Sequence, residues 1–404
     1  MNKVNLISIV LAAINPILGL ISSLLNIIRF KDTTIPLSFS IALIAIYFPI
    51  MYDTASNFFQ AYYSTYYGGG GWGSPYLSIP SYFMYKFGYD FYLFIFIYVF
   101  FVVYTWSNIT LKIFSNFNSN VYIKATLMFI FLTLMFNYRD LMDINRSIFS
   151  FSIFFYYVFL VKKHSLFKFI LFSALSIYFH NSALIIVLIY TLSVFKINSK
   201  VNLFLVLFSL VIGFSLPFFI SKFQSYSSSI PIFGPELSYY LYGDEFAVQT
   251  FTLGTALKKT LNILIILFST YIAMMEIKKD PKDRNLQFII NTACFCLLFY
   301  GFVTFFERVN LAFNFALIYL LSKNLRNYYL YFLAFLIALR SLAVYFLVYF
   351  PIFFGDYSLV VVNNSKKNDM IYKVLYCPSF YLLDIHKNGY SDQFILSNVR
   401  WGKL

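Results

Sequence analysis

Five side chains that could do chemistry fall close together in a chain that otherwise avoids charge: Arg139, Asp140, Asp143, Arg146 and His180. The two arginines are seven residues apart, two turns of a helix, so in a helical segment they share one face, as do the two aspartates. Paired guanidinium groups match the oxygens of a pyrophosphate, because arginine binds phosphate in a bidentate manner. The alternative is a short external turn with arginine–aspartate pairs, which contribute little stability.

His180 lies in the middle of the apolar stretch 166–195. As one continuous helix this stretch would be about 45 Å long, too long for one upright span and short for two. We therefore expect a hairpin that turns at His180, with the imidazole below the membrane surface. A neutral imidazole can accept a proton near neutral pH, which fits a general base. A hydrogen-bonded turn residue with a purely structural role fits the same residues equally well.

Two further arginines stand out nearer the C-terminus. Arg308 follows Glu307 at the expected end of a span, where an ion pair within the chain competes with a phosphate-binding role. Arg340 lies in the middle of an apolar run. Because a charged group is costly there, we expect it to face a cavity or to have an intramembrane partner.

The composition predicts the fold class. Of the 404 residues, 60% are hydrophobic and only 11% are charged, whereas soluble domains have about 25% charged residues. Apolar runs of roughly 18 residues or more recur, long enough to cross a bilayer as helix. We predict an all-α, polytopic helical integral membrane protein. The net charge of +14 comes from Lys and Arg between spans, where an excess sets topology, and does not indicate nucleic acid.

About twelve transmembrane segments are expected, the first retained as a span with a kink at Asn15-Pro16. They cover 6–28, 35–51, 90–113, 122–137, 147–161, the two arms of 166–195, 201–220, 257–275, 286–305, 309–321 and 328–350. With a hairpin at His180, the positive-inside rule places the Lys-rich connections on the cytoplasmic side. The same topology then places five polar segments on the outer side, an outcome that was not used to choose it: 53–89, 139–146, 221–255, Glu307-Arg308 and the C-terminal tail.

The expected domain division is a transmembrane domain, 1–350, and a polar tail, 351–404, on the outer side. The domain contains two long outer segments, 53–89 and 221–255, rich in aromatic residues. The first holds a glycine run, Gly68–Gly73, with no Gly-Lys-Ser/Thr after it, which predicts a connector or lid and not a phosphate loop. The aromatic residues fit interfacial belts better than sugar-stacking platforms.

Several kinds of site are not indicated. Asp140 and Asp143 have the oxygen ligands that Mg²⁺ prefers, but two arginines beside them favour local neutralisation, so we expect metal-independent chemistry without a cofactor. Cys294 and Cys296 have no nearby histidine and predict neither a zinc site nor a disulfide. The chain also has no Gly-x-Ser-x-Gly elbow and no His-Glu-x-x-His motif.

These residues resemble the Wzy/EpsG-type repeat-unit polymerases of bacterial O-antigen, capsule and exopolysaccharide. The resemblance covers Asp53 to about Phe380, most of the chain, in short pieces. They are Asp53 before a Tyr-rich segment, Asn145-Arg146-Ser147 opening a span, the hairpin His180-Asn181-Ser182-Ala183, Glu307-Arg308-Val309 before a short span, and the tail segment Tyr376-Cys377-Pro378-Ser379-Phe380.

The resemblance implies glycosyl transfer at the periplasmic face of the bacterial inner membrane. A sugar hydroxyl of one lipid-linked repeat unit attacks a glycan carried on undecaprenyl pyrophosphate and displaces the lipid pyrophosphate. Arg146 and Arg308 are the first candidates for pyrophosphate clamps, with Arg139 and Arg340 next. His180 is the first candidate for the base, with Asp143 or Asp53 second. The implied partners are undecaprenyl-pyrophosphate-linked oligosaccharides, membrane lipids, a chain-length regulator and a flippase.

Four other functions compete with this interpretation. A lipid-linked oligosaccharide flippase also has about a dozen spans, but it is built from two similar halves, and no repeat is visible here. An O-antigen ligase shares the arginine and histidine chemistry. A membrane acyltransferase could use His180, although its acyl donor comes from the cytoplasmic face. A structural membrane protein would not need the intramembrane arginines.

Overall fold

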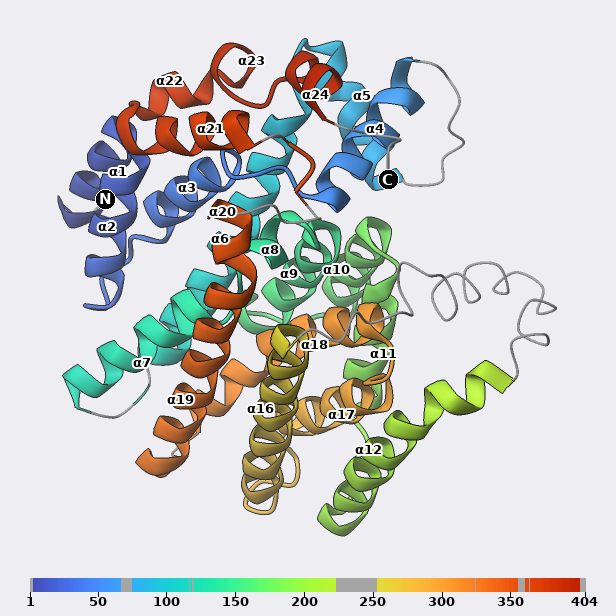
Figure 1. The fold of residues 1–404 in the computed structure, drawn as a ribbon. Helices are drawn as coiled ribbons and strands as arrows, with labels where there is room; N and C mark the ends of the chain where they lie inside the picture. The colour runs from blue at the N-terminus through green and yellow to red at the C-terminus, as the bar shows by residue number, and fades with distance from the viewer. Residues whose placement is uncertain are drawn as a thin grey trace. The chain divides into compact units, whose positions relative to one another are not determined.

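The structure, a computed structural model, describes residues 3–66, 75–115, 117, 120–222, 253–323, 325–354, 360–362 and 364–399. The regular structure within these ranges is helical, and a single β-bridge joins Met51 to Val360. The prediction of an all-α membrane protein is confirmed. The chain forms two compact units, residues 1–183 with 345–404 and residues 184–344 (Figure 1). We call them the terminal unit and the central unit.

The terminal unit contains both ends of the chain. Its helices are α1 (Lys3–Ile14), α2 (Pro16–Ile27), α3 (Thr34–Ala45), α4 (Tyr52–Tyr66), α5 (Pro75–Lys86), α6 (Phe91–Ser115), α7 (Val121–Leu134), α8 (Tyr138–Met142), α9 (Asn145–Leu160) and α10 (Leu166–Phe179), followed much later by a π-helical turn η2 (Tyr345–Tyr349), α20 (Phe350–Phe354), α21 (Asn364–Tyr376), α22 (Ser379–Leu383), α23 (Ile385–Asn388) and α24 (Asp392–Asn398). A cluster of fully buried aromatic residues, including Tyr47, Phe58 and Tyr390, forms its core.

The described residues of the central unit form seven elements. They are α11 (Ser182–Leu192), which starts at the unit boundary, α12 (Ser199–Lys222), α16 (Leu253–Ile277), α17 (Arg284–Leu298), α18 (Val303–Leu317), the 3-10 turn η1 (Ile318–Ser322) and α19 (Asn327–Val344). The second predicted outer segment, 221–255, lies almost entirely outside the described residues.

Five of the described helical stretches are long and apolar enough to cross a membrane: Phe91–Ser115, Ser199–Leu216, Ala256–Ile277, Phe305–Ser322 and Asn327–Phe354. They fall within five of the predicted spans or overlap them closely. Six shorter apolar helices accompany them. The total of about twelve membrane crossings stays a prediction.

The first predicted span is two helices and not one kinked helix. Asn15 has an extended backbone and accepts the N–H of Ile17 at 2.8 Å, so it caps α2, which begins at Pro16. The chain then turns back, because the hydroxyls of Ser8 and Ser22 lie 3.0 Å apart across the turn. Each arm has 12 residues, about 18 Å of helix, and is too short to cross a ~30 Å core.

The segment after the second predicted span is also helical. We expected 53–89 to be an outer connector or lid, but α4 and α5 occupy its described part. Along α4, Ala55, Phe58 and Phe59 are buried at helical spacing in the core of the terminal unit. A one-sided apolar pattern of this kind stabilises a helix by burying one stripe. The glycine run, Gly68–Gly73, for which we predicted a connector or lid, lies outside the described residues.

The predicted polar tail is an integral part of the terminal unit. Met370, Val374 and Leu382 are buried in the same core as the N-terminal helices. The hydroxyl of Tyr47 donates to the carbonyl of Leu382 at 2.7 Å. In Figure 1 the red helices α21 and α22 lie alongside α1, α2 and α3, in agreement with their contacts. The outer location of this segment stays a prediction.

Two aspartates fasten the end of the tail to the long helix α6. Asp392 accepts the N–H of Phe91 at 2.9 Å, and Asp90 accepts the N–H of Asp392 at 2.9 Å, so each carboxylate caps the other's helix. His386 lies 3.1 Å from the second oxygen of Asp90. Burial, together with the charge of Asp90, raises the pKa of Asp392 to about 7. Two adjacent carboxylates of this kind resist simultaneous ionisation.

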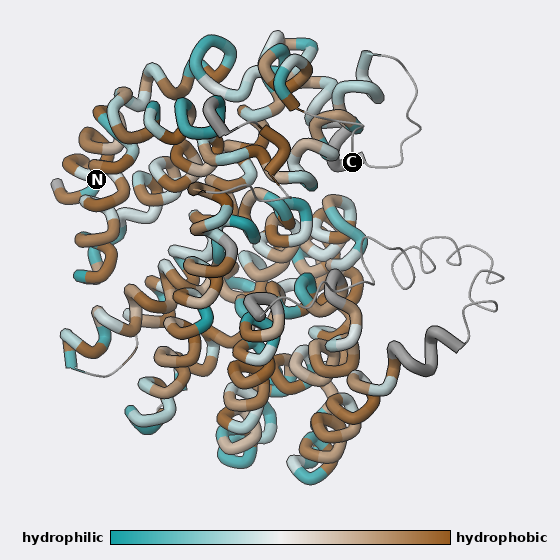
Figure 2. The backbone as a smooth tube through the Cα atoms, in the orientation of Figure 1, coloured by the Kyte–Doolittle hydropathy of each residue, from teal (hydrophilic) through white to brown (hydrophobic). Residues whose placement is uncertain are grey.

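The basic connections of the central unit gather at one end. Helices α12 and α17 run in the same direction, since Asn202 near the start of one pairs with Gln287 near the start of the other at 3.0–3.1 Å. At that end Asp283 accepts from Lys323 and Tyr319. Figure 2 shows hydrophilic (teal) residues at the lower ends of α12 and α16. The predicted common face for Lys196/Lys200, Lys278–Arg284 and Lys323 is therefore confirmed within this unit.

The raised pKa of Asp392 predicts a pH-dependent stability. Because its folded pKa lies above its ordinary value, this group favours the folded state at low pH, and the favourable contribution is lost as the pH rises from about 4 to about 7. Asp392→Asn keeps an oxygen for the N–H of Phe91 and removes the charge. We expect this variant to lose that part of the pH dependence and to melt above the wild type at pH 8, measured by thermal unfolding in detergent.

The half-buried Asp384→Asn is the matched control, because Asp384 lies in the same tail outside the carboxylate pair. If the melting temperatures of wild type and Asp392→Asn run parallel between pH 4 and pH 8, the raised pKa is wrong.

Candidate functional site

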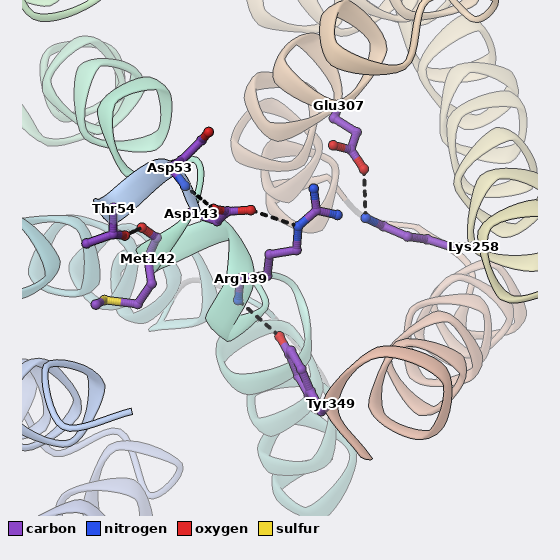
Figure 3. Close-up of polar contacts among 8 residues, drawn as sticks. All are labelled: Asp53, Thr54, Arg139, Met142, Asp143, Lys258, Glu307 and Tyr349. Atoms are coloured by element: carbon purple, nitrogen blue, oxygen red, sulfur yellow. Dashed lines mark hydrogen bonds and ion pairs between the residues drawn. The ribbon is translucent and has the colours of Figure 1, made fainter. Parts of the chain in front are cut away.

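Three of the predicted residues meet at the junction of α4, α8 and α9 (Figure 3). Asp143 is 5% exposed. One of its oxygens accepts from Nε of Arg139 at 3.2 Å, and the other accepts the backbone N–H of Asp53 at 3.1 Å. The side chain of Asp53 points away from this pair in Figure 3. The local ion pair that competed with pyrophosphate binding is therefore present at Arg139.

The short helix α8 carries Arg139 and ends before Arg146. Asn137 and Asp140 form a capping box at its start, in which Asp140 accepts the N–H of Asn137 at 2.9 Å. The helix ends at Met142 and α9 begins at Asn145. Arg139 and Arg146 thus belong to different helices, so the condition for the predicted shared face, one continuous helix, is not met.

Tyr349, which comes much later in the sequence, also contacts this junction. Its hydroxyl lies 3.4 Å from the backbone N–H of Arg139 and accepts from it (Figure 3). Tyr349 belongs to the π-helical turn η2, a type of turn that often marks functional positions. On the other side, the hydroxyl of Thr54 donates to the carbonyl of Met142.

Arg146 opens α9, as predicted, and is half-buried. Within the described ranges its guanidinium makes no hydrogen bond or ion pair, in contrast to Arg139. The neighbouring Asn145 is 2% exposed and accepts from Asn57 at 3.4 Å. Arg146 is therefore the better placed of the two arginines to receive an anion.

His180 ends α10 and caps α11. Its Nδ1 accepts the backbone N–H of Ser182 at 3.1 Å, and the hydroxyl of Ser182 lies 2.7 Å from the same nitrogen. Because a backbone N–H can only donate, Nδ1 is the acceptor and the neutral ring carries its proton on Nε2. The predicted helix break at His180 is confirmed, while the direction of the two arms relative to each other stays a prediction.

The central unit holds a second polar cluster, on α16, α18 and α19. Arg340 is 2% exposed, and its Nη1 donates to Asn262 at 3.3 Å and to Asn314 at 3.5 Å. Lys258 pairs with Glu307 at 3.0 Å (Figure 3). The expected intramembrane partner of Arg340 is thus a pair of neutral amides.

Arg308 lies inside α18, one turn after its start, and not between two spans as predicted. The predicted span 286–305 ends early, because α17 stops at Leu298 and a turn precedes Val303. The cluster also contains Lys259, whose ammonium lies 4.0 Å from the centre of the Tyr300 ring. Among the described residues of this cluster, four are basic, Lys258, Lys259, Arg308 and Arg340, and one is acidic, Glu307, which pairs with Lys258.

Sequence reasoning missed Lys258, Lys259, Asn262 and Asn314. A signal was present in their spacing. Asn262 follows Lys258 by four residues and Asn314 follows Glu307 by seven, so on each helix the two polar side chains share a face. Within the described ranges, no group of three His, Cys, Asp or Glu residues could hold a metal ion. The basic excess suits an anion.

Together the helices, the candidate spans and the buried cations define a polytopic membrane protein with charged groups held inside apolar bundles. The sequence model of the EpsG family matches residues 75–373. The chain belongs to this family of Wzy-like polysaccharide polymerases and exopolysaccharide biosynthesis proteins. No curated protein and no solved structure matches the chain. The match includes all the predicted site residues except Asp53.

The pairing of Arg139 with Asp143 predicts a rescue. Arg139→Met leaves a buried carboxylate without its charged partner, and we expect a loss of about 3 kcal/mol in stability. Adding Asp143→Asn removes the isolated charge, so the double variant should recover most of the loss. Chemical unfolding of the purified protein measures both. A double variant no more stable than Arg139→Met would show that the pair is not what holds this junction.

The capping role of His180 predicts a difference between two substitutions. Asparagine can accept the N–H two residues later in an Asx-turn, whereas alanine cannot. We expect His180→Ala to lower the stability by about 1 kcal/mol and His180→Asn to keep the wild-type melting temperature. Both should lose polymer, because neither retains the Nε2–H donor. Full-length polymer from His180→Asn would restrict His180 to capping.

Proposed function

We propose that this protein joins oligosaccharide repeat units carried on undecaprenyl pyrophosphate, at the periplasmic face of the inner membrane. The hydroxyl oxygen of the acceptor sugar forms a bond to the anomeric carbon of the donor glycan. The bond from that carbon to the pyrophosphate oxygen breaks, and the lipid pyrophosphate leaves with the electron pair. The proton of the hydroxyl passes to a base on the protein. Family membership supports the polymerase-type role.

The observation that carries this proposal is the excess of cations in the central unit. Among the described residues of this cluster, the basic residues Lys258, Lys259, Arg308 and Arg340 outnumber the acidic ones, of which Glu307 pairs with Lys258. A leaving pyrophosphate gains negative charge in the transition state, and fixed cations in a site of low dielectric stabilise that charge. Arginines can do this without a metal. We assign Arg308 and Arg340 to pyrophosphate binding.

Arg340 suits this role because amides hold it. Asn262 and Asn314 accept hydrogen bonds from the guanidinium and orient it, and neither amide carries a charge. In the terminal unit the corresponding candidate is Arg146, which is half-buried and has no ion-pair partner among the described residues. Arg139 is already paired with Asp143 and serves the structure.

The structure changes the ranking of the candidate bases. The lone pair on Nδ1 of His180 is occupied by the N–H of Ser182, so we assign His180 a donor role through Nε2–H. Both oxygens of Asp143 already accept hydrogen bonds. Asp53, whose backbone N–H binds Asp143, stays a candidate for the base.

The proposal predicts a specific glycan defect. With Arg308→Gln, loss of a cation from the cluster should reduce polymer at least about 100-fold, as expected when a transition-state donor is removed. The host should display single repeat units on its surface and lose the polymer ladder on a gel. Arg326→Gln, at the opposite, basic end of the central unit, should give a normal ladder.

Other outcomes identify the competing functions. If a strain in which the gene has been deleted displays no repeat unit at all on its surface, the protein is a flippase or ligase. A normal ladder from a strain that lacks the gene would remove the polymerase proposal.

A further inference from the structure

The C-terminal helices enclose a cleft of about 380 Å³ that no part of the proposed reaction uses. This volume lies within the roughly 300–1,000 Å³ typical of small-molecule sites. One wall is α21 and the other is formed by α23, α24 and the turn between them. The lining residues are Lys366, Asp369, Met370 and Lys373 on the first wall, and His386, Lys387, Gly389, Ser391 and Phe394 on the second.

Basic residues outnumber acidic ones in the lining. Lys366 and Lys373 are seven residues apart on α21 and so lie on one face of the helix, with Lys387 on the opposite wall. One carboxylate, Asp369, lies among them. Lys387 is 77% exposed and sits 3.8 Å from Asp384, a weak ion pair. Like charges around one cleft repel each other, and an anion between them would offset the repulsion.

The walls of the cleft are held in place before any ligand binds. Nζ of Lys373 donates to the carbonyl of Asn388 at 2.7 Å and ties the first wall to the second. Ser391 caps α24 by accepting the N–H of Phe394 at 3.2 Å. At Gly389, a side chain would come within 3.2 Å of the Tyr47 hydroxyl, so the floor rests directly on the core. A site organised in this way loses little entropy on binding.

The lining also has an apolar part, formed by Met370 and the half-buried ring of Phe394. An aromatic ring packs well against the C–H face of a sugar, by dispersion and burial of apolar surface. Lysines beside such a ring fit a ring-shaped ligand with a negative group. A bare inorganic ion would leave the apolar part unused.

The second wall, 386–394, lies beyond the range that the EpsG family model matches, 75–373. The family model thus covers the helices that carry the proposed pyrophosphate-binding arginines and not this wall. A feature outside the shared part suits a property that differs between family members, such as the identity of the glycan.

We propose that this cleft binds an acidic sugar of the glycan, one that carries a carboxylate or a phosphate. This inference rests on the proposed function and specifies its substrate class. The lysines of both walls bind the anionic group, while Phe394 and Met370 contact the sugar ring. The repeat unit that this protein handles is therefore negatively charged, and the terminal unit selects it.

The test is a binding measurement on the full-length protein in nanodiscs of neutral lipid. The probes are a galacturonic acid trisaccharide, mannose 6-phosphate, neutral maltotriose and inorganic phosphate. We expect at least one of the acidic sugars to bind and maltotriose not to bind. The reversal Lys366→Glu/Lys387→Glu should weaken binding at least about tenfold, as expected for two charges facing an anion. Lys86→Glu, an exposed lysine on α5, should bind as the wild type does.

Several results would overturn the proposal. Binding unchanged in the double variant would place the sugar elsewhere. Phosphate bound as tightly as mannose 6-phosphate would reveal a simple anion site, and competition by phosphatidylglycerol vesicles alone would reveal a lipid site. The proposed polymerase function fails separately, if Arg308→Gln leaves the ladder normal. Lost sugar binding in the double variant, with a ladder still formed, overturns selection by the cleft and leaves the polymerase intact.

Discussion

Every polar group buried in an apolar helix bundle has to find its partner inside the protein, because lipid offers none. This constraint decides how both units pack. In the terminal unit, Asp143 joins Arg139 to the start of α4. In the central unit, Arg340 connects α19 to α16 and α18 through Asn262 and Asn314. Apolar contact alone would allow many different helix pairings, whereas these few hydrogen bonds specify which helices pack together.

The chemical identity of the partner then separates structural cations from functional ones. A carboxylate partner neutralises an arginine, so the Arg139–Asp143 pair is a clamp within the fold. An amide partner orients a guanidinium without adding a charge of its own, and this is one ground for proposing Arg340 as an anion-binding residue. The same reasoning applies to His180. The nitrogen that caps α11 serves the fold, and the other nitrogen is the one that carries the ring proton.

The sequence predicts the membrane class and five long helices well, because runs of Phe, Leu and Ile have few alternatives to a helix in lipid. It predicts helix ends poorly. Asn15 caps a new helix where a kink was expected, and Asn137 with Asp140 starts the separate helix α8. A local capping bond of about 1 kcal/mol decides such breaks.

Long-range partners were missed for a different reason. Nothing in the order of residues shows that Lys258 meets Glu307, or that Asn262 meets Arg340, because these pairs are 49 and 78 positions apart. The composition shows that charged residues are rare, and their spacing indicates which face of a helix each of them occupies. Only the packing of the helices reveals which charged groups lie next to one another, and the roles that we propose for the arginines depend on it.

The docking of the tail has a consequence for how the protein is made. Residues 364–399 complete the core against α1, α2 and α3, yet they leave the ribosome after the whole central unit. Until then, Tyr47 and its neighbours lack the surface that covers them. The N-terminal helices are therefore the first to enter the membrane and among the last to reach their final packing. In the interval, a chaperone or the translocon has to shield the part of the chain that was synthesised first.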